Sequence, residues 1–403
     1  MMRTAQQSAG FYLWVMVLIV AGMLAAVLLI VERTEQLQRR TAANQVAEYA
    51  AESVAVIAAR DLNFKAITNR AMLANEVVIG QLLGVYTWYD MARDSSEQIA
   101  LYSAWIPYVN AVTRSLYQVL QRLRGTVQIG VRSLVAAQQG IIALLQQAQW
   151  AFHQASWLST LATAHHVVAS NDEHLQLHLL NHQTLLDIEG LWLRFQERTV
   201  SAADHDDYVR MVQESQDPFS QRRTYRWFDL GLMHGRKAGG SDIKRLQQRI
   251  EWQSVDTLSI HQDLLLRGSE SWLGGSSAFF SQRLPSRGRT SGFGESYRYN
   301  RRASHRAGRL GTMMGVGHSV PRFYRLQAGN SAPQITLIVR SKSDVAGASV
   351  WGAGRAEIYF SRPQDWWPRR DQRDEPANLH NALWQVRVKA IPFWQLELLR
   401  RQL

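Results

Sequence analysis

The feature that most constrains this chain is an uncharged, strongly apolar stretch near its amino terminus, at residues 11–31. As a helix, this stretch would extend roughly 30 Å, about the thickness of one bilayer hydrocarbon core. A cleaved signal peptide is the rival interpretation, but its apolar region would be about half as long and would end at a small-residue cleavage site. The sequence therefore predicts an uncleaved membrane anchor at 11–31, preceded by a short cytoplasmic tail at 1–10.

Small residues recur four positions apart within the predicted anchor. The pairs are Ala21 with Ala25 and Gly22 with Ala26. This spacing lets two membrane helices approach closely, although incidental small residues that face lipid would give the same pattern. We expect either a helix-packing face or no specific contact here, and the sequence leaves both open.

The balance of charges restricts the partners of the chain. Its formal net charge is +12, which favours anionic partners such as nucleic acid, phospholipid headgroups or acidic polysaccharides. Arg33, Arg39 and Arg40 follow the anchor while Arg3 precedes it, and this distribution by itself favours a cytoplasmic bulk. Because the chain contains no cysteine, disulfides, thiolate metal sites and cysteine nucleophiles are excluded.

Proline and glycine divide the remaining chain into two halves. Pro107 is the only proline before Pro218, and alanines cluster between residues 42 and 59, so one long helix is predicted from residue 32 to about 104. Apolar residues recur at helical spacing over 108–163, and 172–197 reads as a further helix with Asn171 or Asp172 as its cap. These segments predict a helical stalk or bundle domain at 32–200, and a linker at 201–220.

After residue 220 the pattern changes to short β-branched and aromatic runs such as ITLIVRS and AEIYFSR. Such runs are typical of strands, and their connections favour a mostly antiparallel sheet in a domain at 221–403. A segment rich in glycine, serine and arginine, 268–320, is predicted to be a long, partly ordered loop. The predicted fold class is therefore α+β: a transmembrane helix that continues into a long helix and bundle, then a β-rich domain.

Three histidines form the clearest candidate metal motif. His174, His178 and His182 stand four residues apart in DEHLQLHLLNHQ, so on one helix adjacent pairs could chelate a divalent ion. The third would lie about 12 Å from the first along the axis and could not reach the same ion. A polar stripe beside apolar leucines explains the same spacing, and no metal is predicted.

An arginine-rich loop is the candidate for anionic ligands. Aromatic residues interleave its arginines, which is a common arrangement for holding single-stranded nucleic acid by phosphate contact and stacking. A solvated loop or a protein contact is the competing interpretation. The arginines are Arg283, Arg287, Arg289, Arg298, Arg301, Arg302, Arg306 and Arg309.

Sequence templates for catalysis are absent. The run Gly274-Gly275-Ser276 is not a nucleophile elbow, and the glycines between 288 and 294 are not followed by the Lys-Ser/Thr of a phosphate loop. No His-Glu-x-x-His occurs either. The sequence thus predicts neither an enzyme nor a cofactor.

The order of these features, and the string QRRTAANQVAEYAAESVAVIAARDLNFKAITNRAMLANEVVIGQLLG at 38–84, resemble the TadE/TadG-like proteins of tight-adherence (Flp) pilus systems. The segments 252–261, 356–363 and 377–388 are similar to strand segments of the larger TadG-related members. Two features of the family are missing here. Val15 stands where processed pilins carry Glu, and no Asp-x-Ser-x-Ser string of a von Willebrand-type metal site occurs.

The resemblance implies a single-pass inner-membrane protein with a cytoplasmic amino terminus and a periplasmic bulk, against the arginine distribution. It also implies a structural role in pilus assembly, with pilin-like proteins as partners and acidic surface polymers as a further possibility. In that setting the alanines of the stretch AARDLNFKAITNRAMLANEVVIG would pack against partner helices, and Asn69, Arg70 and Asn75 would fix register. The alternatives are a polar seam inside the protein's own fold and, for function, a membrane-anchored nucleic-acid-binding protein that uses residues 283–309.

Overall fold

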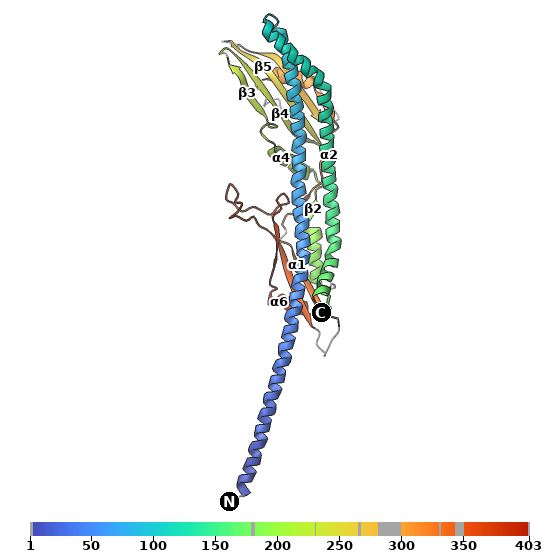
Figure 1. Cartoon of the computed structure of the whole chain (residues 1–403), viewed down its shortest axis with the longest axis vertical. Helices are drawn as coiled ribbons and strands as arrows, with labels where there is room; N and C mark the ends of the chain where they lie inside the picture. Colours follow the sequence, from blue (N-terminus) through green and yellow to red (C-terminus); the bar gives the residue numbers. More distant parts are fainter. Residues whose placement is uncertain are drawn as a thin grey trace.

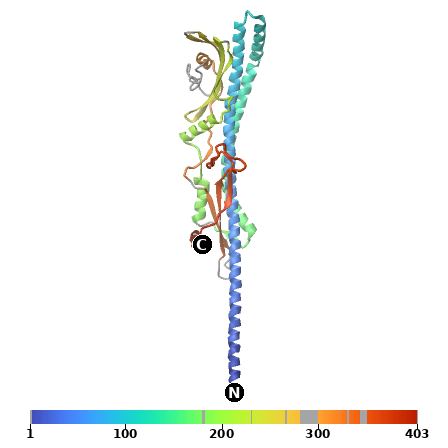
Figure 2. The same ribbon diagram turned by 90° about the vertical axis from the view of Figure 1, so that its left-hand side faces the viewer.

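The computed structural model describes residues 3–178, 182–229, 231–264, 267–280, 300–329, 332–342 and 350–401. Its backbone is a long helical hairpin that carries two separate sheets along one side (Figures 1 and 2). The predicted α+β class is confirmed. The helical part and the β part are not consecutive bodies, however, because β1 and β2 of the first half pair with β9 and β8 of the second, and strands of the second half are mounted on the first helix.

The hairpin consists of α1 (Arg3–Tyr102) and α2 (Pro107–Asn171). At 1.5 Å per residue, α1 is roughly 150 Å long, and Pro107 opens α2 at a position where its missing N–H costs nothing. The two helices run antiparallel. Their contacts include the stacked rings of Phe64 and Phe152, 4.4 Å apart, and a hydrogen bond from the Tyr89 hydroxyl to the carbonyl oxygen of Leu120.

The sheet nearer the amino-terminal end of α1, here called the near sheet, has the strand order β1-β9-β10-β11 and is antiparallel throughout. Its strands are β1 (Leu175–Leu177), β9 (Gln334–Ser341), β10 (Trp351–Phe360) and β11 (Trp384–Val388). Alanine makes this docking possible, because the face of α1 at 43–59 that meets the sheet consists mainly of buried alanines. Those small side chains let the helix backbone lie almost directly on β10.

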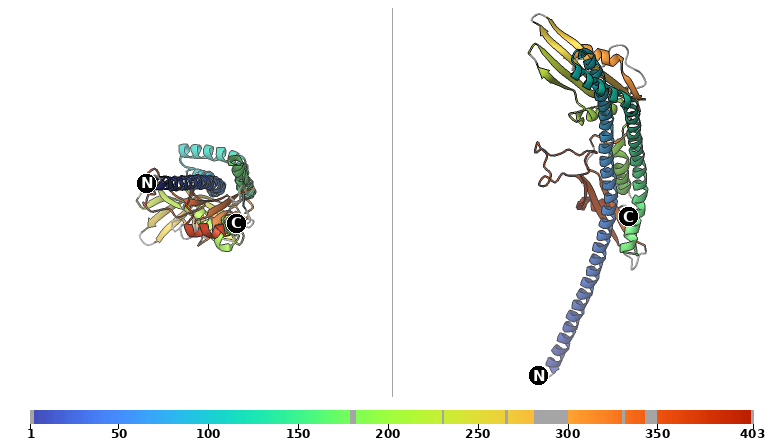
Figure 3. Two further views of the ribbon diagram at one scale, coloured as in Figure 1. Left: turned by 90° about the horizontal axis from the view of Figure 1, so that it is seen from below. Right: turned by 45° about the horizontal axis from the view of Figure 1, so that its top comes forward.

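The far sheet lies toward the tip of the hairpin and has the order β3-β4-β5-β6-β7. Its strands are β3 (Arg223–Asp229), β4 (Met233–Leu246), β5 (Arg249–Leu264), β6 (Arg267–Phe280) and β7 (Thr312–Gly315). The first four are antiparallel, and β7 adds parallel to β6. The ring of Trp252 packs over Gly80 of α1, where any side chain would collide with it. Seen from below, both sheets lie on the same side of α1 (Figure 3).

Shorter elements connect the sheets. They are α3 (His182–Glu189), the π-helical turn η1 (Gly190–Arg194), the pair β2 (Gln196–Arg198) and β8 (Tyr324–Leu326), α4 (Ala202–Glu214), α5 (Arg301–Arg309) and α6 (Phe393–Arg400).

Several local expectations from the sequence were wrong. The predicted helix at 172–197 is instead β1, α3, η1 and part of β2. Helix α4 occupies most of the segment expected to be a linker, 201–220, and begins with a capping box formed by Ser201 and Asp204. Within the predicted loop at 268–320, residues up to Phe280 continue a long strand, and α5 and β7 follow residue 300.

The amino-terminal third of α1 stands apart from the folded part. Residues 13–42 are exposed throughout, and burial begins at Ala43. Within this exposed length, α1 is long and apolar enough to cross a membrane, and α2 passes the same test of length and composition. About 16 Å of polar helix, residues 32–42, separates the apolar stretch from the first buried residue.

Candidate functional site

The candidate site is a series of buried polar side chains along the side of α1 that faces the rest of the protein. They begin inside the stretch at 58–80 and continue toward the tip. Each forms a hydrogen bond or an ion pair with a group from another element. These side chains therefore hold α1 to the rest of the protein. The residues are Asp61, Lys65, Asn69, Glu76, Thr87 and Asp90.

Lys65 lies at the centre of the first cluster and is fully buried. Its Nζ is 2.6 Å from Asp61 Oδ2, 2.7 Å from Gln196 Oε1 of β2 and 2.8 Å from His153 Nδ1 of α2. The ring of Tyr324 in β8 covers the ammonium group, with its centroid 4.0 Å from Nζ. Four elements thus meet at one side chain.

Burial and charge act against each other in this cluster. Burial lowers the pKa of Lys65 from its usual 10.5 to about 8, although the Asp61 carboxylate opposes the change. Burial raises the pKa of Asp61, but hydrogen bonds with His153 and Lys65 and the attraction of Lys65 outweigh it, so that the pKa is lower than usual. The pair is therefore held in its charged form at neutral pH.

Asn69 binds β8 and the segment before β11 to α1 through two backbone carbonyls. Its Nδ2 donates to Tyr324 O at 2.9 Å and to Leu379 O at 2.7 Å, and its Oδ1 accepts from Gln149 Nε2 at 2.6 Å. An amide side chain, with donors and an acceptor on one group, can satisfy all three contacts at once.

For Asn69, the structure favours a polar seam inside the protein's own fold over register with a partner helix. Asn69 is 2% exposed and is used inside the protein. Arg70 bonds Asn381, and Asn75 donates to Ala71 O of its own helix. Ala58 and Ala59 pack in the protein's own core with the near sheet, whereas Ala74 is exposed. A register role with a partner helix is therefore not what Asn69 performs here.

Glu76 connects α1 to the far sheet. Its Oε1 accepts from Trp252 Nε1 at 2.8 Å, and its Oε2 lies 3.2 Å from His318 Nε2 and 3.4 Å from the Tyr208 hydroxyl. Burial, followed by the nearby charge of Glu76, raises the pKa of Tyr208 well above its usual value. The phenol therefore remains a donor to the carboxylate at all physiological pH values.

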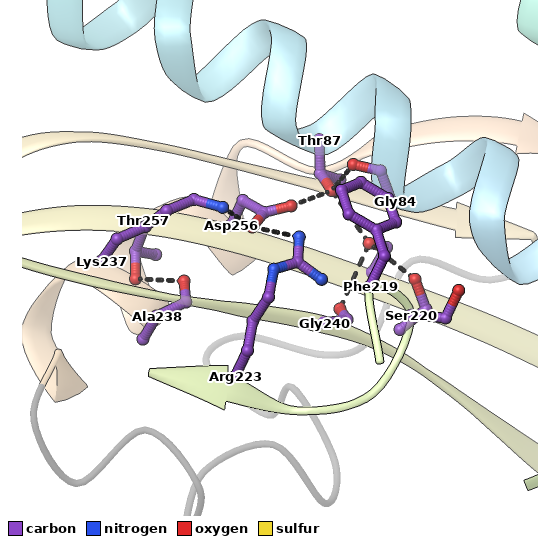
Figure 4. Close-up of polar contacts among 12 residues, drawn as sticks. Gly84, Thr87, Phe219, Ser220, Arg223, Lys237, Ala238, Gly240, Asp256 and Thr257 are labelled. Carbon is purple, nitrogen blue, oxygen red and sulfur yellow. Dashed lines mark hydrogen bonds and ion pairs between the residues drawn. The ribbon is translucent and has the colours of Figure 1, made fainter. Parts of the chain in front are cut away.

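Asp256 of β5 is the centre of the next cluster, drawn in Figure 4. Its Oδ1 is 3.0 Å from Lys237 Nζ and 3.2 Å from Arg223 Nη2, and its Oδ2 accepts from Thr87 Oγ1 of α1 at 2.7 Å. Burial raises the pKa of this carboxyl, and the attraction of Lys237 and Arg223 opposes the rise. A carboxylate from the sheet and a hydroxyl from the helix here join two layers.

A last cluster lies near the tip. Asp90 Oδ1 is 3.0 Å from Arg93 and 3.1 Å from Arg124 of α2, and its Oδ2 accepts from Ser276 of β6 at 2.9 Å. One carboxylate therefore connects α1, α2 and the far sheet.

The buried clusters do not line the two hollows described for the chain. Two hollows of about 360 and 410 Å3 lie elsewhere, and no residue of the four charged clusters lines either one. The second hollow is an open depression on α1 formed by Arg70, Leu73, Ala74, Val77, Val78 and Gln81, with Ser215 and Asp217 beside them. What the arrangement does physically is fasten α2, the β2–β8 pair and the far sheet to fixed positions on α1.

The histidine and arginine candidates do not form a site in the described part of the chain. His174 and His178 flank β1, and His182 begins α3, so the expected single helical stripe is wrong. No cluster of three or more His, Asp or Glu suited to a metal occurs among the described residues. Arg283, Arg287, Arg289 and Arg298 lie outside the described residues.

The remaining arginines of the basic segment, Arg301, Arg302, Arg306 and Arg309, lie on α5. The Arg306 guanidinium stacks over the ring of Trp272 at 4.5 Å, so this arginine has an internal contact. Nucleic-acid binding by the segment stays a prediction. Ala21, Gly22, Ala25 and Ala26 are exposed on α1, and their packing role also stays a prediction.

Asp61, Lys65, Glu76 and Thr87 were missed as functional positions by the sequence reasoning. The available signal was an acidic and a basic residue, Asp61 and Lys65, four positions apart in an alanine-rich helix. An ion pair on a solvated helix surface gives the same pattern. No family model, curated protein or solved structure matches this chain.

Proposed function

We propose that the protein is a non-enzymatic, single-pass inner-membrane component of a Tad/Flp-type pilus or a related secretion apparatus. Its amino terminus lies in the cytoplasm and its folded part in the periplasm. The observation that carries the proposal is that one unbroken helix, α1, joins an uncovered apolar segment to both sheets. The resemblance to TadE/TadG-like proteins supplies the pilus setting.

The mechanism is scaffolding. A helix alone would bend and slide against its neighbours, but the glycines of β10 seat the near sheet at one height on α1, and Glu76 and Thr87 hold the far sheet through Trp252 and Asp256. The hairpin partner α2 stiffens the same length through Asp90 and Lys65. The protein therefore presents its surfaces at set distances from the membrane, where pilin-like partners and acidic surface polymers are met.

The open hollow on α1 is the place where we expect a pilin-like partner to make lateral contact. It lies on the same helix that crosses the membrane, and apolar Ala74 and Val78 line it beside Arg70. A partner helix anchored in the same membrane would run alongside α1 and reach this hollow without bending.

The first experiment is topology mapping by thiol labelling. The chain has no cysteine, so Thr4→Cys and Gln118→Cys each introduce a single thiol. A membrane-impermeant maleimide added to sealed spheroplasts should label the thiol at 118 and not the thiol at 4. Labelling at 4 alone would place the folded part in the cytoplasm and refute the pilus assignment.

The second experiment is genetic. Deleting the gene should abolish pilus assembly and adhesion, and the wild-type chain should restore both. Ala74→Glu places a charge in the hollow and should restore poorly, whereas Gln45→Glu, also at an exposed position of α1, should restore fully. Unchanged pilus assembly in the deletion strain would count directly against the proposed function.

A further inference from the structure

The side of α2 that faces away from α1 carries a second apolar stripe, here called the α2 seam. Its members repeat every seven residues in two interleaved series, and every one is an apolar residue or glycine that is exposed or half-exposed. They are Leu116, Leu120, Leu123, Val127, Gly130, Leu134, Ala137, Ile141, Leu144, Ala148, Ala151, Ala155, Leu158 and Ala162.

The other side of α2 is already occupied. Val135, Ile142, Gln149 and Ser156 are buried there, and they also lie seven residues apart. Both sheets lie on one side of the helical hairpin, as Figure 2 shows, and most members of the seam are exposed. Val127 is the exception that packs against the core between α1 and the far sheet. Leu144 is 65% and Leu158 75% exposed, which is unusual for leucines that repeat in register along a helix.

A strict seven-residue apolar repeat is the signature of a helix that pairs with another helix in a left-handed coiled coil. The seam runs for about 70 Å, and a helix contact about 10 Å wide would cover roughly 700 Å2 on each partner. Two such strips together bury about 1,400 Å2, within the range of stable, specific protein interfaces. The seam is therefore large enough to hold a dimer.

Charge on and beside the seam indicates which helix fits. Helix α2 contains no Asp or Glu, and from residue 133 to its end it contains no Lys or Arg. The charged residue of α2 nearest the seam is Arg124, and its Nε lies 3.1 Å from Asp90 Oδ1 of α1. Nothing along the contact selects an oppositely charged partner, and an identical helix would meet no like charge there.

We propose that the α2 seam binds the α2 seam of a second copy of this chain, as a parallel helix pair in register. Two copies with the same membrane anchor stand in the same orientation, so their α2 helices run in the same direction. In register, the bulky residues from 116 to 144 meet each other, and Ala148, Ala151 and Ala155 meet each other. The direction of the helices rests on the membrane anchorage of the proposed function, whichever side of the membrane the folded part occupies.

The test is disulfide crosslinking of the full-length protein in native membranes. Ala151→Cys and Leu123→Cys place single thiols on the seam, and Gln118→Cys places one at an exposed position on the other side of α2. Mild oxidation should give a dimer of the chain for the two seam thiols and none for the control. Because Ala151 lies away from the middle of the seam, an antiparallel pair would not bring two copies of it together.

A second variant separates specific pairing from chance collision. Leu144→Glu, at an exposed position, should abolish the dimer formed by the Ala151→Cys thiol, whereas Gln118→Glu should leave it intact. Equal crosslinking at 118 and 151, or a dimer that persists with Leu144→Glu, would overturn the inference. So would quenching by brominated lipid of a fluorophore attached to the Ala151→Cys thiol, because the seam would then face the bilayer.

The two proposals fail separately. No seam dimer in a protein with correct periplasmic labelling at 118 would refute the helix pair and leave the scaffold intact. A seam dimer with cytoplasmic labelling would support the pair and refute the pilus assignment.

Discussion

Gly354 of β10 faces Glu48 of α1 so closely that a methyl group on Gly354 would lie within 3.0 Å of the Glu48 backbone. Gly352 has the same relationship to Ala43 and Asn44. The helix and the strand therefore touch backbone to backbone. Glycine in the strand and alanine in the helix are two parts of one contact, and this contact seats the near sheet on α1.

Gly354→Ala is expected to destabilise the near sheet. The added methyl group meets main chain rather than a movable side chain, and overpacking of this kind costs about 1–3 kcal/mol. Chemical denaturation of the full chain in detergent measures the change. Gly125→Ala is the matched control, since its methyl group would meet nothing within 4 Å on α2, and it should stabilise by about 0.5–1 kcal/mol. Equal effects at the two glycines would contradict this account.

Lys65→Met is expected to destabilise the protein strongly. It leaves the Asp61 carboxylate buried without its cation, and breaking a buried ion pair in this way costs about 3–5 kcal/mol. The double variant Asp61→Asn with Lys65→Met removes both charges and should recover most of the loss. Arg39→Met, which breaks the exposed pair with Glu35, should change little. A single variant as stable as the wild type would show that the pair contributes nothing.

The same lysine predicts a rise of stability in alkali. In the folded protein, Lys65 loses its proton near pH 8, whereas in the unfolded chain it keeps the proton up to about pH 10.5. Between these values the unfolded state binds more protons, so the free energy of unfolding rises with pH. The wild type should therefore gain stability relative to the double variant between pH 8 and 10.5, measured by denaturation at intervals. A constant difference would contradict the lowered pKa.

The parts of the fold that the sequence predicts are those determined by local pattern. The apolar stretch at 11–31 and the alanines at 43–59 indicate a long helix with a closely packed face, and both are present. What covers that face is β10, whose glycines lie some 300 residues further along the chain. A run of small side chains shows that something approaches closely, but it does not distinguish a strand from a partner helix.

The local pattern also predicted the wrong secondary structure where pairing with a distant strand overrides it. Leucines and histidines at 175–182 fit a helical period, yet Leu175–Leu177 forms β1 because β9 offers an edge to pair with. In contrast, α4 carried a readable start signal, Ser201 three residues before Asp204, which the polar composition of the segment obscured. The buried clusters could not be predicted, because the partners of Lys65 come from α2, β2 and β8.

Glu76 is expected to hold the far sheet specifically. Glu76→Leu removes the acceptor of the Trp252 indole N–H, which is fully buried, and a buried donor without a partner costs about 1–3 kcal/mol. Glu76→Gln keeps a carbonyl oxygen for that donor and should cost less. Asn75→Ala is the control, since its amide bonds only within α1 among the contacts described.

Limited proteolysis with mass spectrometry tests whether the loss is local. Because Trp252 lies on β5 and its bond to Glu76 is one of the contacts that hold the far sheet on α1, the Glu76→Leu variant should be cleaved first within β4, β5 and β6. The near sheet is seated on α1 through the glycines of β10, which do not involve Glu76, so β9 and β10 should stay protected. Simultaneous cleavage of both sheets would mean that α1 and its two sheets unfold as one unit, and that the clusters do not act as separate fastenings.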